Sequence, residues 1–271
     1  MNVLMCANEF AFYGTEVVLY SLLKYNKNVN ITIFTGTIDI DTHDGVIYNH
    51  RALNEVQQNE LHKVVNYFDS NSTLKIVDVV DLFNTELEGG GKNRYTGFTP
   101  HSMLRLLSDV YYDPAVSDLM YLDSDLIITE NIEDEYNKYT HIDSPYSAFY
   151  APDAVGYEGE MNSGVIFFNM RKCKEIDFFK RARINLINNA YKYPDQMAMK
   201  DVCDAHPIPS TLNYFYNLID IHETPKIIHF TNELKCKPYN EKGEMYFHKL
   251  YPQFDYIKDG IKIIREANIK A

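Results

Sequence analysis

The sequence predicts an α/β fold in which helices flank a largely parallel sheet. Segments with strand-like and helix-like patterns alternate over the first 130 of the 271 residues, as they do in chains that build βαβ units. The chain is 45% hydrophobic and 24% charged, a balance that suits one large globular domain with a sizeable core. We place this domain at residues 1–240 and interpret residues 241–271 as a C-terminal helical appendage.

The strands are predicted from short apolar or alternating runs. The run NITIFTG alternates between polar and apolar side chains, whereas NSGVIFFNM is apolar over most of its length. In order along the chain, the predicted strands are 3–6, 30–36, 74–82, 120–128, 146–150, 162–170 and 226–230.

The helices are predicted from apolar side chains that recur at helical spacing. We expect helices at 15–26, 51–68, 99–113, 175–190 and 195–205, and a C-terminal helix within 257–270 that packs on the domain. The side chains expected to face the core are Val18, Leu19, Leu22 and Leu23 in the first helix, Leu53, Val56, Leu61, Val64 and Val65 in the second, Met103, Leu104, Leu107 and Val110 in the third, and Ile257, Ile261 and Ile264 in the last. The glycine run from Gly89 to Asn93 predicts a flexible break, and residues 89–100 form the candidate lid or acceptor loop.

The net charge and the cysteine content indicate which classes of partner the protein can bind and in which compartment it is expected. The formal net charge is −12, and residues 109–135 contain nine carboxylates and no Lys or Arg. Such a field repels nucleic acid and anionic lipid, so we expect no nucleic-acid partner and at most peripheral contact with a membrane. The four cysteines are widely spaced, the chain start lacks a basic signal-peptide region, and no apolar run approaches the roughly 20 residues of a bilayer span. We therefore expect a cytoplasmic protein with reduced thiols, and any membrane contact would be at the inner face.

The stretch MYLDSDLIITENI, residues 120–132, sets two aspartates into an otherwise apolar strand. Carboxylates near a core need a proton, a partner or a metal to compensate them, and no Lys or Arg lies between Leu106 and Asn137. Asp123 and Asp125 point the same way from an extended chain, because side chains alternate along it. They can therefore share one hard divalent cation, Mn²⁺ or Mg²⁺. An exposed acidic loop is the alternative.

Position separates this pair from a second triplet, Asp39-Ile40-Asp41, which we interpret as a solvated loop. The later pair follows an apolar strand, and ligands of parallel sheets gather at strand carboxyl ends. An EF-hand is excluded, because Ile127 and Ile128 occupy its fifth and sixth positions. A haloacid-dehalogenase-like phosphatase also places Asp-x-Asp after an apolar strand. That class, however, has the pair near the amino terminus, Thr or Val at Leu126 and a later Gly-Asp pair, none of which is present.

Three further segments follow the aspartate pair in a fixed order: MNSGVIFFNM (161–170), YPDQMAMKDV (193–202) and IIHFTNELKCKPY (227–239). Together with YLDSDLII (121–128) they resemble glycosyltransferase family 8, the retaining sugar-nucleotide transferases that include glycogenin and bacterial lipopolysaccharide galactosyl- and glucosyltransferases. The resemblance runs from about residue 2 to 240. It implies a GT-A fold, in which a Rossmann-like nucleotide-binding half and an acceptor-binding half share one mixed sheet flanked by helices.

The resemblance implies a metal site. Asp123 and Asp125 would coordinate Mn²⁺ or Mg²⁺, His229 would supply the third protein ligand, and Ser124 would lie against the nucleotide. By itself, a lone histidine after an apolar strand is more often structural. The ion would bridge the two phosphates and neutralise charge on the departing nucleoside diphosphate.

The resemblance also assigns basic residues to the donor. Lys237 matches the family's Lys-Pro-aromatic motif, but Lys235 has the usual offset from His229, so either lysine is a candidate for holding the diphosphate. Arg105 matches an arginine that the family aims at the donor sugar or phosphates. Its position off the main apolar face of its helix suits that role and equally suits a surface arginine.

The amino-terminal loop departs from the family pattern. The family places Asp-x-Asn-Tyr here, with the tyrosine stacked on uracil, whereas this chain has Asn8-Glu9-Phe10-Ala11 after Ala7. Ala7, Asn8 and Phe10 are the candidate base-binding residues, and Asn8 can hydrogen-bond a uracil edge. Phe10 or Phe12 could replace the stacking ring, or both could belong to the core.

Three polar residues are the catalytic candidates by the same resemblance. Asn162 would lie near the transferred sugar, and Asp195 and Gln196 would lie beneath its anomeric carbon. Asp195 is also expected to cap the helix that follows it. Because a side-chain amide is a feeble nucleophile, the expected mechanism is front-side displacement, with Gln196 stabilising positive charge through its carbonyl oxygen.

The expected function is therefore metal-dependent, retaining transfer of a hexose, galactose or glucose, from a UDP-sugar to a glycan or glycolipid acceptor. Two alternatives remain: a catalytically silent nucleotide-sugar-binding subunit and the phosphatase described above. The sequence gives no prediction of the acceptor's identity or of the oligomeric state.

Overall fold

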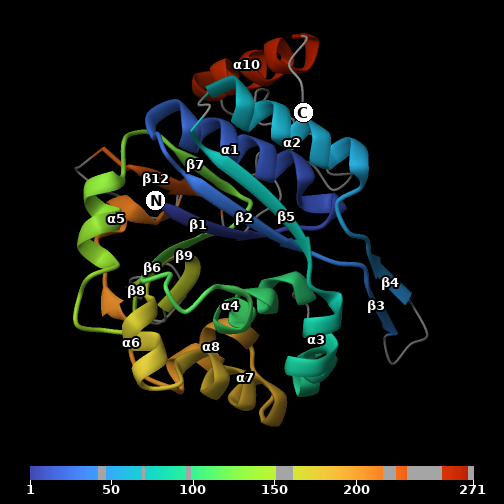
Figure 1. Ribbon diagram of the computed structural model, residues 1–271, viewed down its shortest axis with the longest axis vertical. Helices are drawn as coiled ribbons and strands as arrows, with labels where there is room; N and C mark the ends of the chain where they lie inside the picture. The colour runs from blue at the N-terminus through green and yellow to red at the C-terminus, as the bar shows by residue number, and fades with distance from the viewer. Residues whose placement is uncertain are drawn as a thin grey trace.

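A seven-stranded mixed sheet lies at the centre of the molecule, with helices on both of its faces (Figure 1). The computed structural model describes residues 1–41, 47–68, 71–95, 99–150, 161–215, 224–230 and 252–267. In spatial order the strands are β10 (His206–Pro207), β8 (Tyr146–Tyr150), β9 (Met161–Asn169), β6 (Asp118–Leu122), β1 (Asn2–Cys6), β2 (Asn30–Thr35) and β5 (Thr73–Asp78). Strands β6, β1, β2 and β5 run parallel, whereas β9 runs antiparallel to both of its neighbours. The predicted α/β class with a largely parallel sheet is confirmed.

Two apolar cores cover the two faces of this sheet. Along β1, Val3 and Met5 point into one core and Leu4 and Cys6 into the other, because successive side chains of a strand face opposite sides. The first core is covered by α1 (Phe12–Tyr25), α2 (Glu55–Phe68), α5 (Glu133–Tyr139) and α10 (Asp255–Glu266). The second is covered by α3 (Val80–Glu86), the 3₁₀ helix η3 (Pro100–Leu107), α4 (Ser108–Tyr111), α6 (Met170–Glu175), α7 (Phe178–Asn188) and α8 (Pro194–Lys200).

Two smaller sheets complete the strands. In one, β12 (Ile227–His229) lies between β11 (Tyr214–Phe215) and β7 (Leu126–Ile128), antiparallel to β7. Its register sets His229 opposite Leu126. The other is a hairpin of β3 (Ile38–Asp41) and β4 (Ile47–His50). The short 3₁₀ helices η1 (Glu9–Ala11), η2 (Glu88–Asn93), η5 (Ser210–Leu212) and η7 (Pro252–Phe254) lie in the connections.

Several predicted boundaries were wrong for local reasons. The strand predicted at 120–128 is two strands of different sheets, because β6 ends at Leu122 and β7 begins at Leu126, so Asp123 and Asp125 lie between them. The strand predicted at 74–82 ends at Asp78, whose carboxylate accepts a hydrogen bond from the Val80 amide at the start of α3. The helix predicted at 175–190 is broken at Asp177, which has a left-handed φ of 51°. The helix predicted at 195–205 ends at Lys200. The Asp39 triplet belongs to strand β3 of the hairpin, not to a loop.

Two side chains predicted to face the core are exposed. Val56 is 71% exposed, because the inward stripe of α2 that passes through Leu61 and Val64 reaches Gln57 one turn earlier. Val110 is 41% exposed. Its segment is a 3₁₀ helix up to Leu107 and a single α turn afterwards, so the periodicity of a continuous α-helix does not apply.

The glycine run, predicted as a flexible break, is a turn that contacts the end of α7. Gly89, Gly90 and Gly91 all have positive φ, and a Cβ at Gly91 would lie 2.5 Å from Ile187 Cα. Asn93 is fully buried and donates to the carbonyl oxygens of two residues at the end of α7, one of them Asn189 at 2.7 Å. Only Gly fits this close approach in this conformation. Of the candidate lid or acceptor loop, residues 96–98 lie outside the described residues.

The predicted C-terminal helix packs as expected. Ile257, Ile261 and Ile264 of α10 are buried in the first core against α1 and α2 (Figure 1). The domain boundary predicted at residue 240 lies outside the described residues. Within the described part of the chain, none of the helices has the length and apolar character that crossing a bilayer requires.

An ion pair ties α10 to α1 and predicts a pH-dependent stability. Arg265 contacts the fully buried Glu16 carboxylate at 2.6 Å. Burial raises the pKa of Glu16 from 4.5 to about 7, and Arg265 limits that rise. Since the pKa is raised in the folded state, this group favours folding most at low pH, and the contribution is lost as the pH rises through about 7.

We expect Arg265→Gln to lower the free energy of unfolding by about 1–2 kcal/mol more near pH 8 than near pH 5. At the higher pH the buried Glu16 carboxylate is charged and loses its partner, whereas at the lower pH it is protonated. Urea unfolding at both pH values measures this, with Lys262→Gln as the control because Lys262 is 71% exposed on the same helix. An equal loss at both pH values would contradict the assignment.

Candidate functional site

A cleft of about 470 Å³ opens where β1 and β6 end, and most of the predicted site residues line it. Those on its wall are Asn8, Phe10, Arg105, Asp123, Ser124, Asp125, Asn162, Asp195, Gln196 and His229. Ala7 lies behind the wall, buried, with its amide donating to Phe34 O. Lys235 and Lys237 lie outside the described residues.

Three potential metal ligands converge in this cleft. Asp123 follows β6, Asp125 precedes β7, and His229 ends β12. One ligand atom from each lies within 4.8 Å of the other two, and His229 Nε2 is 3.1 Å from Asp125 Oδ1 and 4.0 Å from Asp123 Oδ2. Asp125 and His229 are 7% and 3% exposed. Long-range folding has therefore brought together residues a hundred positions apart.

The arrangement fits a divalent cation. Adjacent ligands of an octahedral ion with bonds of about 2.1 Å lie about 3 Å apart, which is close to the separation of His229 Nε2 and Asp125 Oδ1. Two carboxylates and an imidazole suit Mn²⁺ better than Ca²⁺. The described residues hold no other group of three or more His, Cys, Asp or Glu side chains with this spacing.

Gly164 makes the approach of His229 possible. A Cβ at this position would lie 2.2 Å from His229 Cε1 and 3.0 Å from Asp123 Oδ2. The Gly164 carbonyl accepts a hydrogen bond from the Asp123 amide at 2.9 Å. The missing side chain is therefore required for space, in the middle of the longest strand of the sheet.

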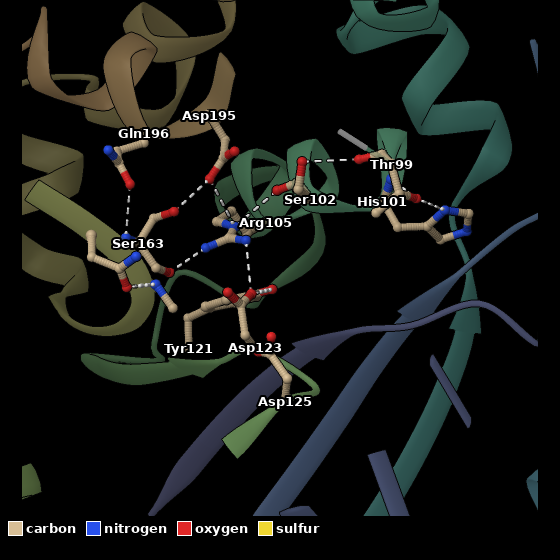
Figure 2. A network of polar contacts seen from close by, with 12 residues as sticks. Thr99, His101, Ser102, Arg105, Tyr121, Asp123, Asp125, Ser163, Asp195 and Gln196 are labelled. Carbon is tan, nitrogen blue, oxygen red and sulfur yellow. Dashed lines mark hydrogen bonds and ion pairs between the residues drawn. The ribbon is translucent and has the colours of Figure 1, made fainter. Parts of the chain in front are cut away.

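The buried guanidinium of Arg105 lies between the carboxylates of Asp123 and Asp195 (Figure 2). Arg105 is 1% exposed, which excludes the surface role left open by the sequence. Its Nη2 donates to Asp123 Oδ1 at 3.0 Å, and its Nε lies 3.4 Å from Asp195 Oδ2. The guanidinium stacks on the Tyr121 ring, 3.7 Å from its centroid. Burial would lower the pKa of Arg105, but Asp195, Tyr121 and Asp123 raise it above its usual range, so the group stays charged.

Asp195 and Gln196 are held against β9. Asp195 Oδ2 accepts from Ser163 Oγ at 3.0 Å, and Gln196 Oε1 accepts from the Ser163 amide at 3.2 Å (Figure 2). Burial raises the pKa of Asp195, and Arg105 limits the rise. The predicted capping role of Asp195 was wrong: Tyr193 is the N-cap of α8, and Asp195 lies within the first turn because Pro194 begins the helix.

Three ring side chains, Phe10, His50 and His101, also line the cleft and offer surfaces on which a nucleotide base could stack. Phe10 is 50% exposed there, whereas Phe12 is buried in the core. Two histidines that the sequence did not indicate, His50 and His101, lie with ring centroids 6.0 Å apart. Burial lowers the pKa of His101 to about 4, so this ring is neutral at physiological pH.

Several residues that line the cleft were not predicted from the sequence, and some of them have no local pattern that would indicate a site. His50 ends a hairpin strand and His101 lies in a 3₁₀ helix, so their meeting depends on tertiary packing. Ser163 and Tyr121 lie within strands that the sequence did predict. Side chains alternate between the two faces of a strand, so the register of these strands could have indicated that Ser163 and Tyr121 face the cleft.

Solved glycosyltransferases share this fold. The chain covers half of the bifunctional glycosyltransferase WbbM, with 99% of its own residues matched, a TM-score of 0.71 and 15% identity. It covers 96% of the galactosyltransferase LgtC, with 96% matched, a TM-score of 0.68 and 13% identity. It covers 61% of the glycosyltransferase GlyE of Streptococcus pneumoniae TIGR4, with 97% matched, a TM-score of 0.63 and 15% identity.

These likenesses confirm the predicted GT-A fold. No protein-family model matches the sequence, and no curated protein matches it. At identities of 13–15%, the shared architecture is what the comparisons establish.

Proposed function

We propose that this protein is a retaining, metal-dependent glycosyltransferase of family 8 type, which moves a hexose, galactose or glucose, from a UDP-sugar to a glycan or glycolipid acceptor. One observation carries the proposal. Asp123, Asp125 and His229 converge within 4.8 Å in a cleft of about 470 Å³ in a GT-A fold, where a divalent cation would meet a diphosphate.

The three ligands would hold Mn²⁺ or Mg²⁺, which supplies Lewis-acid stabilisation of the charge on the leaving diphosphate. Arg105 contributes by holding the acids in place. Each of its three nitrogens already contacts a group of the protein, including Asp123 and the carbonyl oxygens of Ser102 and Ser163. Lys235 or Lys237 remains the proposed second cation for the diphosphate.

The geometry suits front-side displacement. The Ser163 amide fixes the Gln196 carbonyl oxygen, which is thus pre-oriented to stabilise positive charge on the anomeric carbon. The bond from that carbon to the UDP oxygen breaks, the acceptor oxygen bonds to the same face, and the acceptor proton passes to the departing phosphate.

The solved neighbours lend support in substrate class. LgtC was solved in complex with donor and acceptor sugar analogues, and a further LgtC structure carries an active-site glutamine changed to glutamate. A donor sugar and an acceptor sugar meeting beside a glutamine is the arrangement that we propose for Gln196.

The decisive experiment measures UDP release from UDP-glucose and UDP-galactose, with a panel of sugar acceptors. We expect release with Mn²⁺ and its loss with EDTA, because the diphosphate charge is then uncompensated. The anomeric configuration of the product tests retention. Binding of the sugar nucleotide with neither transfer nor slow hydrolysis would instead support a silent nucleotide-sugar-binding subunit. Metal-dependent phosphate release from simple phosphomonoesters would support a phosphatase.

The same assay tests the catalytic residue. Gln196→Ala should lower turnover about 100-fold or more, in the range observed when one preorganised polar group is removed from a transition state. UDP affinity, measured by calorimetry, should remain within a few-fold of the wild-type value. A collapse of UDP affinity would show that Gln196 binds the nucleotide instead.

A further inference from the structure

We propose that Asn162 and Asn213 form a hydrogen-bonded relay that keeps a proton on His229 Nδ1 and leaves Nε2 to face Asp123 and Asp125. The relay runs from the backbone of β9 through two side-chain amides to the imidazole. It makes Asn213, which no sequence motif indicated, a positioning residue for the metal site. The role of the relay in metal binding rests on the proposed function, whereas its hydrogen bonds do not.

The first link fixes the orientation of Asn162. The Gly164 amide lies 2.9 Å from the side-chain oxygen of Asn162. A backbone N–H can only donate, so the atom facing it must be the amide oxygen and not the amide nitrogen. The Oδ1 and Nδ2 atoms of Asn162 are thereby distinguished by chemistry.

The second link fixes the orientation of Asn213. Its side chain lies 2.9 Å from the same Asn162 oxygen. Since that oxygen accepts only, Asn213 must present Nδ2 to it and Oδ1 to its other side. Asn213 is fully buried immediately before β11, where an unpaired amide would be costly.

The third link fixes the proton on the imidazole. Asn213 Oδ1 lies 2.8 Å from His229 Nδ1, so Nδ1 must carry the hydrogen that is donated. In the neutral ring, Nε2 is then the nitrogen with the lone pair. That nitrogen lies 3.1 Å from Asp125 Oδ1 on the cleft side.

Packing holds the ring in the same orientation. The Phe215 ring meets the imidazole edge to face, with centroids 5.7 Å apart and planes at 80°. Strands β11 and β12 pair with Phe215 opposite His229, so the chain segment that follows Asn213 also orients the ring. Partners of this kind typically change metal affinity 10–100-fold when they are removed.

Loss of the relay has a defined consequence. With no acceptor at Nδ1, the imidazole can place its hydrogen on Nε2 and donate it to Asp125 Oδ1 instead. The proton then occupies the position that the lone pair would use for a cation. Asn213→Leu should therefore impair the metal site although Asn213 does not line the cleft.

The test combines NMR with metal titration. Long-range ¹H–¹⁵N spectra of the metal-free protein should show a proton on His229 Nδ1, with the resonance assigned by its loss in His229→Gln. In Asn213→Leu the Nε2–H tautomer should dominate, and Mn²⁺ affinity measured by calorimetry should fall about 10–100-fold. Asn213→Asp keeps the acceptor for Nδ1 but loses the donor to Asn162 Oδ1, so it should retain the Nδ1 proton and bind Mn²⁺ more tightly than Asn213→Leu, although it should lower stability.

Asn26→Leu provides the matched control, because Asn26 is an equally buried asparagine at the end of α1, away from the cleft. It should lower stability without changing the tautomer or Mn²⁺ affinity. A wild-type spectrum with Nδ1 unprotonated would overturn the relay, and it needs no variant to fold. If the wild-type protein binds no Mn²⁺, the metal-dependent function fails, while the Nδ1 proton still decides the relay.

Discussion

Replacement of Gly164 by alanine is expected to weaken Mn²⁺ binding at least about 100-fold. This exceeds the effect of removing a hydrogen-bond partner of a metal ligand, which is typically about 10–100-fold. The added Cβ would lie 2.2 Å from His229 Cε1 and 2.8 Å from Nδ1. Gly164 lies within β9, and its carbonyl accepts from the Asp123 amide. The backbone therefore cannot easily yield, and the imidazole must move away from the two aspartates.

The measurement is calorimetric titration of Mn²⁺ into wild type and Gly164→Ala, with the melting temperature of each protein recorded. Gly260→Ala is the matched control, because a Cβ at Gly260 in α10 would lie 2.0 Å from the Tyr20 hydroxyl oxygen. That variant should lose stability but keep its Mn²⁺ affinity. Equal Mn²⁺ affinity in Gly164→Ala and wild type would remove His229 from the metal site.

Arg105→Met is expected to lower the free energy of unfolding by about 3–5 kcal/mol, the cost of leaving a buried charge without its partner. Asp195 is 4% exposed and would lose its countercharge. The carbonyl of Ser163 and Asp123 Oδ1 would also lose a donor. Lysine at position 105 should recover only part of the loss, because an ammonium cannot reproduce the fork of the guanidinium.

Urea unfolding measures this loss, and Arg183→Met is the matched control. Arg183 is 5% exposed, but its carboxylate partners Asp109 and Glu86 are 36% and 41% exposed. Water can solvate those carboxylates when the arginine is removed, so the expected loss is smaller, about 1–2 kcal/mol. A loss in Arg105→Met no larger than in Arg183→Met would show that Asp195 does not depend on the Arg105 charge.

The sheet could be predicted well because its signals are local. Strands β1, β2, β6, β8 and β9 were anticipated from apolar or alternating runs, and α1 and α10 from apolar stripes. The errors fall where a local period is interrupted. Asp177 breaks a helix with a left-handed φ, and the 3₁₀ geometry before Ser108 removes Val110 from the core.

The candidate site could be predicted only in part. The aspartate pair stood out because two carboxylates interrupt an apolar strand, and His229 was indicated by resemblance to a family motif. Gly164 lay inside the quoted MNSG motif, but nothing in the sequence shows that its missing side chain makes room for an imidazole 65 positions away. Asn213 and His50 had no signal of any kind.

Taken alone, the sequence determined most of the strands and helices, most of the faces that they bury, and the position of Asp123 and Asp125 directly after an apolar strand. These properties depend on neighbours within a few positions, and the periods of strand and helix express them directly. The tertiary structure alone decided that β12 pairs with β7, that His229 enters the space beside Gly164, and that Arg105 is buried between two acids. Such contacts join residues far apart in the chain through packing and hydrogen-bond direction, which no local pattern encodes.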